Sequence, residues 1–327
     1  MTDVALGKHS PNNSMMDYLI KGWQANRPLT ILGISMLITL VFTLIAMVVD
    51  WKVITGQNAW VKPAKFAISI SIYSFTLLWM LTFIKNRPHV VGFISWITVV
   101  GFIIEMVAII GQVLRGTTSH FNNSTPFDDF VYSWMSYAIV AIWLCCFVVG
   151  IFLLFQKLHD PVFAWSLRFG ILIALVGMGV AFLMTLPTEQ QRIQEEETGI
   201  SLIEGAHSVG VEDGGTGLPL LGWSTEGGDL RIGHFVGLHG MQVLPLIGLM
   251  LSSSMLSHHI RCEGRILLVF IAGISYLLLI VLLTWQALRG QSITAPDHIT
   301  IAFFISLLVG TLLSVVTTFS LFKIRKA

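Results

Sequence analysis

Long apolar segments recur along this chain, and each is about as long as a helix that crosses a lipid bilayer. A membrane-spanning helix requires about 20 mostly apolar residues. About eight segments meet this requirement, at 28–50, 63–84, 91–114, 130–156, 164–186, 234–256, 266–288 and 299–321. Only 11% of the residues are charged, against roughly 25% in soluble domains. The sequence therefore predicts an all-α integral membrane protein in direct contact with the lipid bilayer.

Two similar pentapeptides close two of these segments. Gln112–Gly116 reads QVLRG and Gln286–Gly290 reads QALRG, and a polar loop with a proline follows each of them. We therefore predict two tandem four-helix repeats, which are parallel because each holds an even number of spans. The predicted divisions are a cytoplasmic segment at 1–27, a first repeat at 28–156, and a second repeat at 157–327 with a long outer loop at 188–233. Within 1–27, an interfacial helix and a disordered lead-in are alternatives.

The distribution of Lys and Arg predicts the orientation. If the N-terminus is inside, the inner segments hold most of the 19 basic residues, so the positive-inside rule favours two cytoplasmic termini. The first residues lack the basic-then-apolar order of a cleavable signal, which favours a bacterial inner membrane. A net charge of +1 argues against nucleic acid as a partner. Protein partners are not indicated.

One carboxylate lies deep inside a predicted span. Glu105 precedes the outer end of its segment by about ten residues, or about 15 Å of helix, which places it near the membrane centre. An ionisable side chain there is costly and is a functional candidate by default. The alternative is a protonated acid that is hydrogen-bonded to a neighbouring helix. Gln112 follows seven residues later and shares the same helix face.

Basic and amide side chains recur at the predicted outer ends of both repeats. The ligand-binding candidates are Lys62, Lys65, Gln112, Arg115, Arg231, Gln242, Gln286 and Arg289. The planar guanidinium group suits carboxylates and phosphates, so these residues predict an anionic small ligand. Two alternatives are pairing with Asp128, Asp229 and Asp297, and snorkelling towards lipid phosphates.

Histidines near the same ends are the metal-ligand candidates, namely His120, His207, His234 and His239. Imidazole binds iron, copper and zinc, so haem or a transition metal is the candidate cofactor. However, His234 and His239 are too far apart around an ideal helix to share one ion. The catalytic residues are unknown, with Glu105, Glu226 and Asp229 as candidate carboxylates. Acidic residues of the outer loop, including Glu212 and Asp213, also suit a hard cation such as Ca²⁺.

The sequence leaves three functions open. The first is an outward-facing polar site at the mouth of the helix bundle, which binds haem, a transition metal or an anionic small ligand in a redox or metal-dependent role. The second is a proton-coupled small-solute transporter that uses Glu105. The third is a sensory or assembly protein. No Walker loop, dinucleotide-binding glycine turn or HExxH motif occurs, so enzymatic activity is undetermined.

Overall fold

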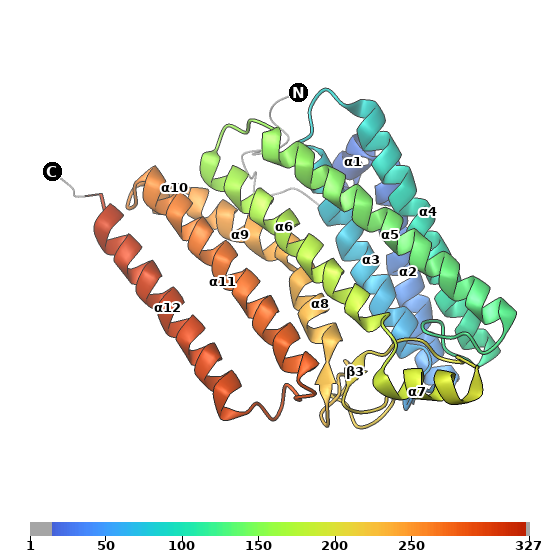
Figure 1. Cartoon of the computed structure of the whole chain (residues 1–327). Helices are drawn as coiled ribbons and strands as arrows, with labels where there is room; N and C mark the ends of the chain where they lie inside the picture. Colours follow the sequence, from blue (N-terminus) through green and yellow to red (C-terminus); the bar gives the residue numbers. More distant parts are fainter. Residues whose placement is uncertain (1–14, 325–327) are drawn as a thin grey trace. The chain divides into compact units, whose positions relative to one another are not determined.

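The computed structural model describes residues 15–324, most of which lie in helices (Figure 1). Among these residues, eight spans are long and apolar enough to cross a membrane. They are α2 (Arg27–Val49), α3 (Val61–Leu81), α4 (Pro88–Arg115), α5 (Pro126–Phe155), α6 (Pro161–Met184), α8 with α9 (Leu230–Leu238 and Gly240–Ser252), α11 (Cys262–Leu288) and α12 (His298–Phe322). The prediction of a helical, multi-pass integral membrane protein is confirmed.

Local capping signals set where the helices begin. Pro88, Pro126 and Pro161 stand in the first turns of α4, α5 and α6, where a missing backbone N–H costs nothing. Thr125 caps α5 by accepting a hydrogen bond from the Asp128 amide. The observed α5 therefore begins before the predicted start at 130, because its first turn is polar and capped rather than apolar.

The sixth span is broken in its middle. The predicted segment at 234–256 begins earlier, at Leu230, and its two helical parts α8 and α9 meet at His239. Near the break, the Tyr276 hydroxyl donates a hydrogen bond of 2.7 Å to the Val236 carbonyl, so α11 satisfies a backbone acceptor of α8. Pro245 lies inside α9, and because proline lacks a backbone N–H it cannot donate the helical hydrogen bond to the carbonyl four residues earlier. His239 thus lies at a helix break rather than within a continuous helix.

Shorter elements connect the spans. They are α1 (Met15–Ala25), the hairpin β1 (Val53–Ile54) and β2 (Gln57–Asn58), α7 (Glu189–Thr198), the antiparallel pair β3 (Ser208–Val209) and β4 (Gly228–Asp229), and α10 (Ser254–Ser257). The interfacial position of α1 stays a prediction. Residues 1–14 and 325–327, which contain Lys8, Arg325 and Lys326 of the orientation argument, lie outside the described residues.

The chain divides after Gln156 into two compact units, here called unit 1 (residues up to 156) and unit 2 (157 onwards). In unit 1, α2 packs on α3, α4 packs on α5, and α4 also touches α2 and α3. In unit 2, α6 packs on α8, α9 and α11, and α11 packs on α12. Buried aliphatic side chains such as Ile109, Ile142 and Ile173 fill the interiors.

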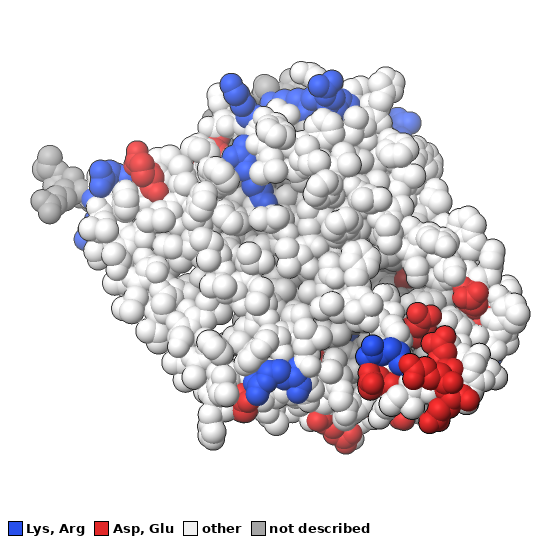
Figure 2. Space-filling view, in the orientation of Figure 1, with Lys and Arg blue, Asp and Glu red and all other residues white. Residues whose placement is uncertain are grey.

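Charged side chains gather at the ends of the helices on the face shown in Figure 2, and the surface between those ends is almost free of them. Acidic side chains crowd the part of this face that α7 occupies, and the α7 sequence carries Glu189, Glu195, Glu196 and Glu197. Large apolar side chains are exposed along the spans, among them Phe303 and Leu313 of α12. An uncharged, apolar helix surface fits lipid as its solvent.

Candidate functional site

The three candidate arginines each form an ion pair with an aspartate of the chain. Arg115 pairs with Asp128, Arg231 with Asp229, and Arg289 with Asp297. Of the three alternatives for these arginines, the structure therefore supports pairing with the aspartates. Arg289 donates a hydrogen bond of 2.6 Å to Asp297, and this bond is the main reason that the pKa of Asp297 lies below its usual range.

The two QxLRG sequences end their helices in the same way. Gly116 and Gly290 adopt left-handed backbone conformations, with φ of 79° and 68°, which glycine permits without steric cost. In each case the arginine pairs with an aspartate at the beginning of the next helix. The glutamines differ, because Gln112 donates to Asp128 whereas Gln286 donates to the Ser292 carbonyl. The motif therefore ends a helix in both units.

Three of the four candidate histidines have hydrogen-bonding partners within unit 2. His207 Nδ1 lies 2.6 Å from Asp213, His234 Nδ1 lies 2.8 Å from the Gly177 carbonyl, and His239 Nδ1 lies 3.2 Å from Gln242. Within residues 15–324, no group of three or more His, Cys, Asp or Glu is arranged to hold a metal ion. The geometry therefore gives no support to a metal or haem site built from these histidines.

Two acidic residues of the long loop hold its backbone together. Asp213 accepts hydrogen bonds from the His207 and Ser208 amides. Burial opposes ionisation of Asp213, but its hydrogen bonds with His207 prevail and lower its pKa well below the usual range. Asp229 is 1% exposed, caps α8 and pairs with Arg231. Its oxygens are thus already engaged, which leaves Asp229 poorly suited to act as a base or as a Ca²⁺ ligand.

Unit 1 contains a different arrangement around Glu105. This carboxylate of α4 is 1% exposed, and among the described residues neither of its oxygens has a partner with hydrogen-bonding geometry. His120 Nε2 lies 3.3 Å from Glu105 Oε1, within ion-pair distance but outside that geometry. A buried carboxylate without a full hydrogen bond is energetically costly, and such an exception requires an explanation.

The other ring nitrogen of His120 faces polar groups. Lys62 Nζ, from the first turn of α3, and Ser119 Oγ each lie 3.1 Å from His120 Nδ1. An ammonium group can only donate, so Nδ1 accepts from Lys62, and the proton of the neutral ring lies on Nε2, facing Glu105. Burial, and then the charge of Lys62, lower the pKa of His120, which keeps the ring neutral near pH 7. We call Lys62, His120 and Glu105 the relay cluster.

The loop between α4 and α5 holds His120 in place. Asn122 donates hydrogen bonds to the Thr117 hydroxyl and to the Thr118 carbonyl. Phe121 is buried and adopts a left-handed φ of 61°, a strained conformation that persists only where its surroundings enforce it. Aromatic rings of Phe66 and Phe121 lie 5.7 and 6.1 Å from the imidazole ring. The loop is therefore an ordered cover that presents His120 to α4.

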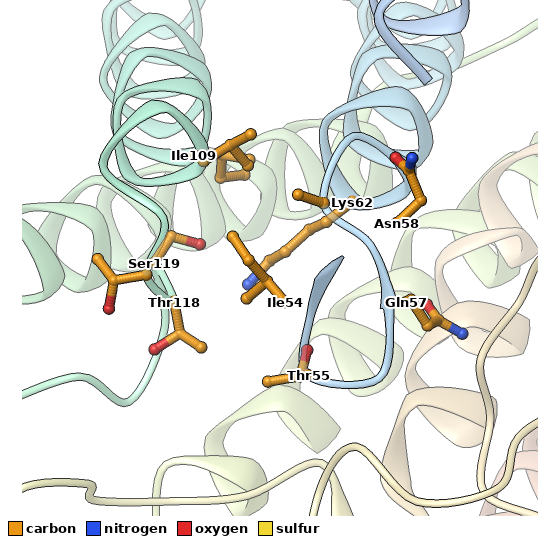
Figure 3. Close-up of a pocket in the computed structure, with 11 residues that line it drawn as sticks. Ile54, Thr55, Gln57, Asn58, Lys62, Ile109, Thr118 and Ser119 are labelled. Atoms are coloured by element: carbon orange, nitrogen blue, oxygen red, sulfur yellow. The ribbon is translucent and has the colours of Figure 1, made fainter. Parts of the chain in front are cut away.

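A small pocket lies beside the relay cluster. It is formed by the β1–β2 hairpin, the first turn of α3, the end of α4 and the following loop, and its volume is about 60 Å³. Figure 3 shows the Lys62 side chain extending across it towards the loop that carries Thr118 and Ser119. The pocket lining is Ile54, Thr55, Gln57, Asn58, Ala59, Lys62, Ile109, Val113, Thr117, Thr118 and Ser119. We call it the Lys62 pocket.

Polar residues recur along the buried face of α4. Thr98, Glu105 and Gln112 follow each other at seven-residue spacing, which keeps them on one face, and all three are buried. Ser95 lies one turn before Thr98 and accepts a hydrogen bond of 2.6 Å from Asn26. Ser95 and Thr98 were not among the predicted site residues, although their spacing from Glu105 is readable in the sequence.

The predicted site residues thus separate into two groups. Glu105, His120 and Lys62 converge in unit 1, while Arg115, Arg231 and Arg289 are paired with aspartates. Lys65 lies one turn after Lys62 in α3, Gln242 lies 3.2 Å from His239 in unit 2, and Glu226 belongs to the long loop of unit 2. Comparison with known proteins finds no match, since no family model fits the chain and no curated protein or solved structure is similar enough to count.

Proposed function

We propose that this membrane protein transfers protons through unit 1 as part of proton-coupled transport of a small solute, with Glu105 as the buried proton acceptor. The observation that carries the proposal is the contact of His120 Nε2 with Glu105, a carboxylate that is 1% exposed and lacks a fully formed hydrogen bond. Ionisable groups inside a membrane commonly mark proton or ion pathways. Lys62 offsets the negative charge of Glu105 through the imidazole between them.

The proposed transfer uses both nitrogens of the imidazole. When Lys62 withdraws, Nδ1 of His120 takes a proton from a hydronium ion that enters the Lys62 pocket from outside and is left as water, and Nε2 gives its own proton to Glu105 Oε1. The ring ends neutral with its proton on Nδ1, and the carboxylate becomes a neutral acid. Because the lowered pKa of His120 keeps the ring neutral near pH 7, Nδ1 remains available as the acceptor.

Polar groups beyond Glu105 support continuation of the path. Thr98 lies about 10 Å farther along α4 from Glu105, at 1.5 Å of rise per residue, and its hydroxyl is buried. The next polar group is the Ser95–Asn26 pair near the beginning of α4. Water would bridge the intervals between these groups in the proposed path.

The proposed topology places both termini in the cytoplasm and the Lys62 pocket outside. It is supported by the excess of Lys and Arg in the inner segments. The proposed duplication is supported by the shared ending of α4 and α11 and by the similar packing order of the spans within each unit. A bacterial inner membrane remains our proposal for the location. No ligand grouping within residues 15–324 favours the haem or metal alternative.

Proton uptake into proteoliposomes that contain a pH-sensitive dye tests the proposal. We expect Glu105→Gln to abolish solute-driven uptake, and His120→Gln to slow it about 100-fold or more, since a positioned proton carrier contributes roughly 10²–10⁴ in rate. Glu189→Gln, in the exposed helix α7, is the matched control and should behave as the wild type. Normal uptake by a correctly folded Glu105→Gln protein would contradict the proposal.

A further inference from the structure

We infer that unit 2 binds the phosphate group of an anionic phospholipid where α11 begins and α12 ends, at a site independent of the proton path. The two helix ends lie side by side (Figure 1), and a Cβ added at Gly264 would collide with the Phe322 side chain. The Arg261 amide donates a hydrogen bond of 3.0 Å to the Phe322 carbonyl, and Ile260 forms a β-bridge with Lys323. These contacts bring basic residues of both helices to one end of the unit.

Two arginines at this end differ from the aspartate-paired arginines described above. Arg261 and Arg265 are one helical turn apart, so they share a side of α11, where like charges repel and where the dipole at a helix beginning disfavours cations. Arg261 donates to the Leu321 carbonyl and Arg265 to the Leu251 carbonyl. Within residues 15–324, neither arginine forms an ion pair with a carboxylate.

The nearby carboxylates do not compensate this charge. Glu263 is exposed and lies two residues from Arg261 and from Arg265, a spacing at which helical residues do not face each other. Asp160 caps α6 by accepting hydrogen bonds from two backbone amides. Lys323, which is also exposed, adds a third positive charge. This end of the unit therefore has an excess of positive charge that attracts an anion.

Three buried polar atoms at this end have no hydrogen-bonding partner among the described residues, namely Nε of Arg265 and the hydroxyls of Ser252 and Ser253. A terminal nitrogen of Arg265 lies 3.1 Å from the Leu251 carbonyl, and the two serines follow Leu251 directly. Because consecutive Cα atoms are about 3.8 Å apart, both hydroxyls lie within about 8 Å of that carbonyl. Buried donors without acceptors are costly, and an oxyanion could accept from all three groups.

The position in the membrane indicates which oxyanion this is. α11 has 27 residues, or about 40 Å of helix, whereas the hydrocarbon core is about 30 Å thick. Its ends therefore reach the headgroup layer, where lipid phosphates lie. The guanidinium fork suits phosphate oxygens. Exposed apolar side chains near this end, namely Leu267, Val316 and Leu321, offer a surface for the acyl chains.

Native mass spectrometry of the full-length protein in detergent, titrated with phosphatidylglycerol or phosphatidylcholine, tests this inference. We expect the wild type to bind phosphatidylglycerol at least about tenfold more tightly, because the choline cation would face the basic residues. Arg265→Gln should weaken phosphatidylglycerol binding about tenfold or more, since it removes charge-assisted hydrogen bonds. Arg265→Lys should recover only part of the loss, because lysine lacks the fork. Arg87→Gln, which removes an exposed arginine at the beginning of α4, is the matched control and should bind as the wild type does.

A second variant separates binding from folding. Replacing both Ser252 and Ser253 by Ala leaves the charge unchanged and should weaken phosphatidylglycerol binding about threefold or more. The melting temperature of this variant without lipid should be unchanged or higher, since buried hydroxyls without partners are removed. A lipid-free melting curve for each variant identifies any protein that fails to fold.

Three results would overturn the inference. They are equal binding of the two lipids by the wild type, wild-type binding by a folded Arg265→Gln protein, and full displacement of phosphatidylglycerol by inorganic phosphate. The last result would show a site for the free ion rather than for a lipid. Because the experiment measures lipid binding alone, failure of the proposed proton path would not change its outcome, and either proposal can fail without the other.

Discussion

At the residue scale, Glu105 is informative because it is buried. Burying a carboxylate near the membrane centre costs free energy, whereas the same residue at the surface would need no explanation. The sequence predicted its depth and its functional role as a candidate, because helical rise alone places it far from the end of α4. The sequence did not predict the contact of His120 with Lys62. That contact requires the loop after α4 to fold back, with Phe121 in a left-handed conformation and Asn122 bonded to Thr117. Spacing along the chain carries no signal for such a fold.

The buried imidazole of His120 makes a prediction about pH. Burial lowers the folded-state pKa of His120 below the ordinary histidine value of 6.5. The unfolded chain therefore binds more protons than the folded protein as the pH falls through 6.5, and the free energy of unfolding decreases. We expect the apparent melting temperature of the wild type to fall between about pH 7 and 5. His120→Gln should lose less over the same interval. An equal loss in both proteins would show that His120 does not charge on unfolding.

Asp128 provides a test of how the QVLRG sequence ends α4, since Arg115 of that sequence pairs with it. It is 3% exposed and accepts hydrogen bonds from Gln112, Arg115 and Thr125. Asp128→Ala leaves these donors without their acceptor and should lower the free energy of unfolding of unit 1 by about 1–3 kcal/mol. Asp129→Ala changes the neighbouring exposed carboxylate and should have little effect. Thermal unfolding of both variants, measured side by side, provides the comparison, and a similar small change in each would contradict the assignment.

At the element scale, the spans were predictable and their interruptions were not. Apolar runs of membrane-crossing length predict helices because backbone groups in lipid must be satisfied within the segment. The break at His239 is accompanied by a contact from another helix, since the Tyr276 hydroxyl of α11 donates to the Val236 carbonyl, and the apolar pattern of the segment carries no signal for that contact. The paired arginines were one of several alternatives in the sequence, since only folding decides which aspartate reaches which arginine.

Close packing of α6 against α8 yields a matched pair of glycine variants. A Cβ added at Gly177 would lie 2.5 Å from the backbone of Gly237, whereas one added at Gly179 meets nothing within 4 Å. We expect Gly177→Ala to destabilise unit 2 by about 1–3 kcal/mol through overpacking. Gly179→Ala should be neutral or slightly stabilising, since alanine favours helix. Melting temperatures in the same detergent would decide, and equal values would refute the close approach of these helices.

At the scale of the whole molecule, the orientation in the membrane is open to direct mapping. We expect single cysteines introduced at Thr118 and Thr294 to react with an impermeant thiol reagent from outside intact cells. Cysteines at Asn86 and His159 should react only after the membrane is opened, because these loops follow the positive-inside rule. The starting protein would carry Ser in place of Cys145, Cys146 and Cys262. Labelling from outside at Asn86 would reverse the proposed topology.

The most direct test of the central claim is infrared difference spectroscopy of the reconstituted protein during a rapid drop in external pH. We predict that the wild type gains the carbonyl band of a buried, protonated carboxylic acid. Glu105→Gln should lack this band, and His120→Gln should gain it more slowly. If the same band appears at the same rate in the wild type and in Glu105→Gln, Glu105 is not the proton acceptor and the proposed relay is wrong.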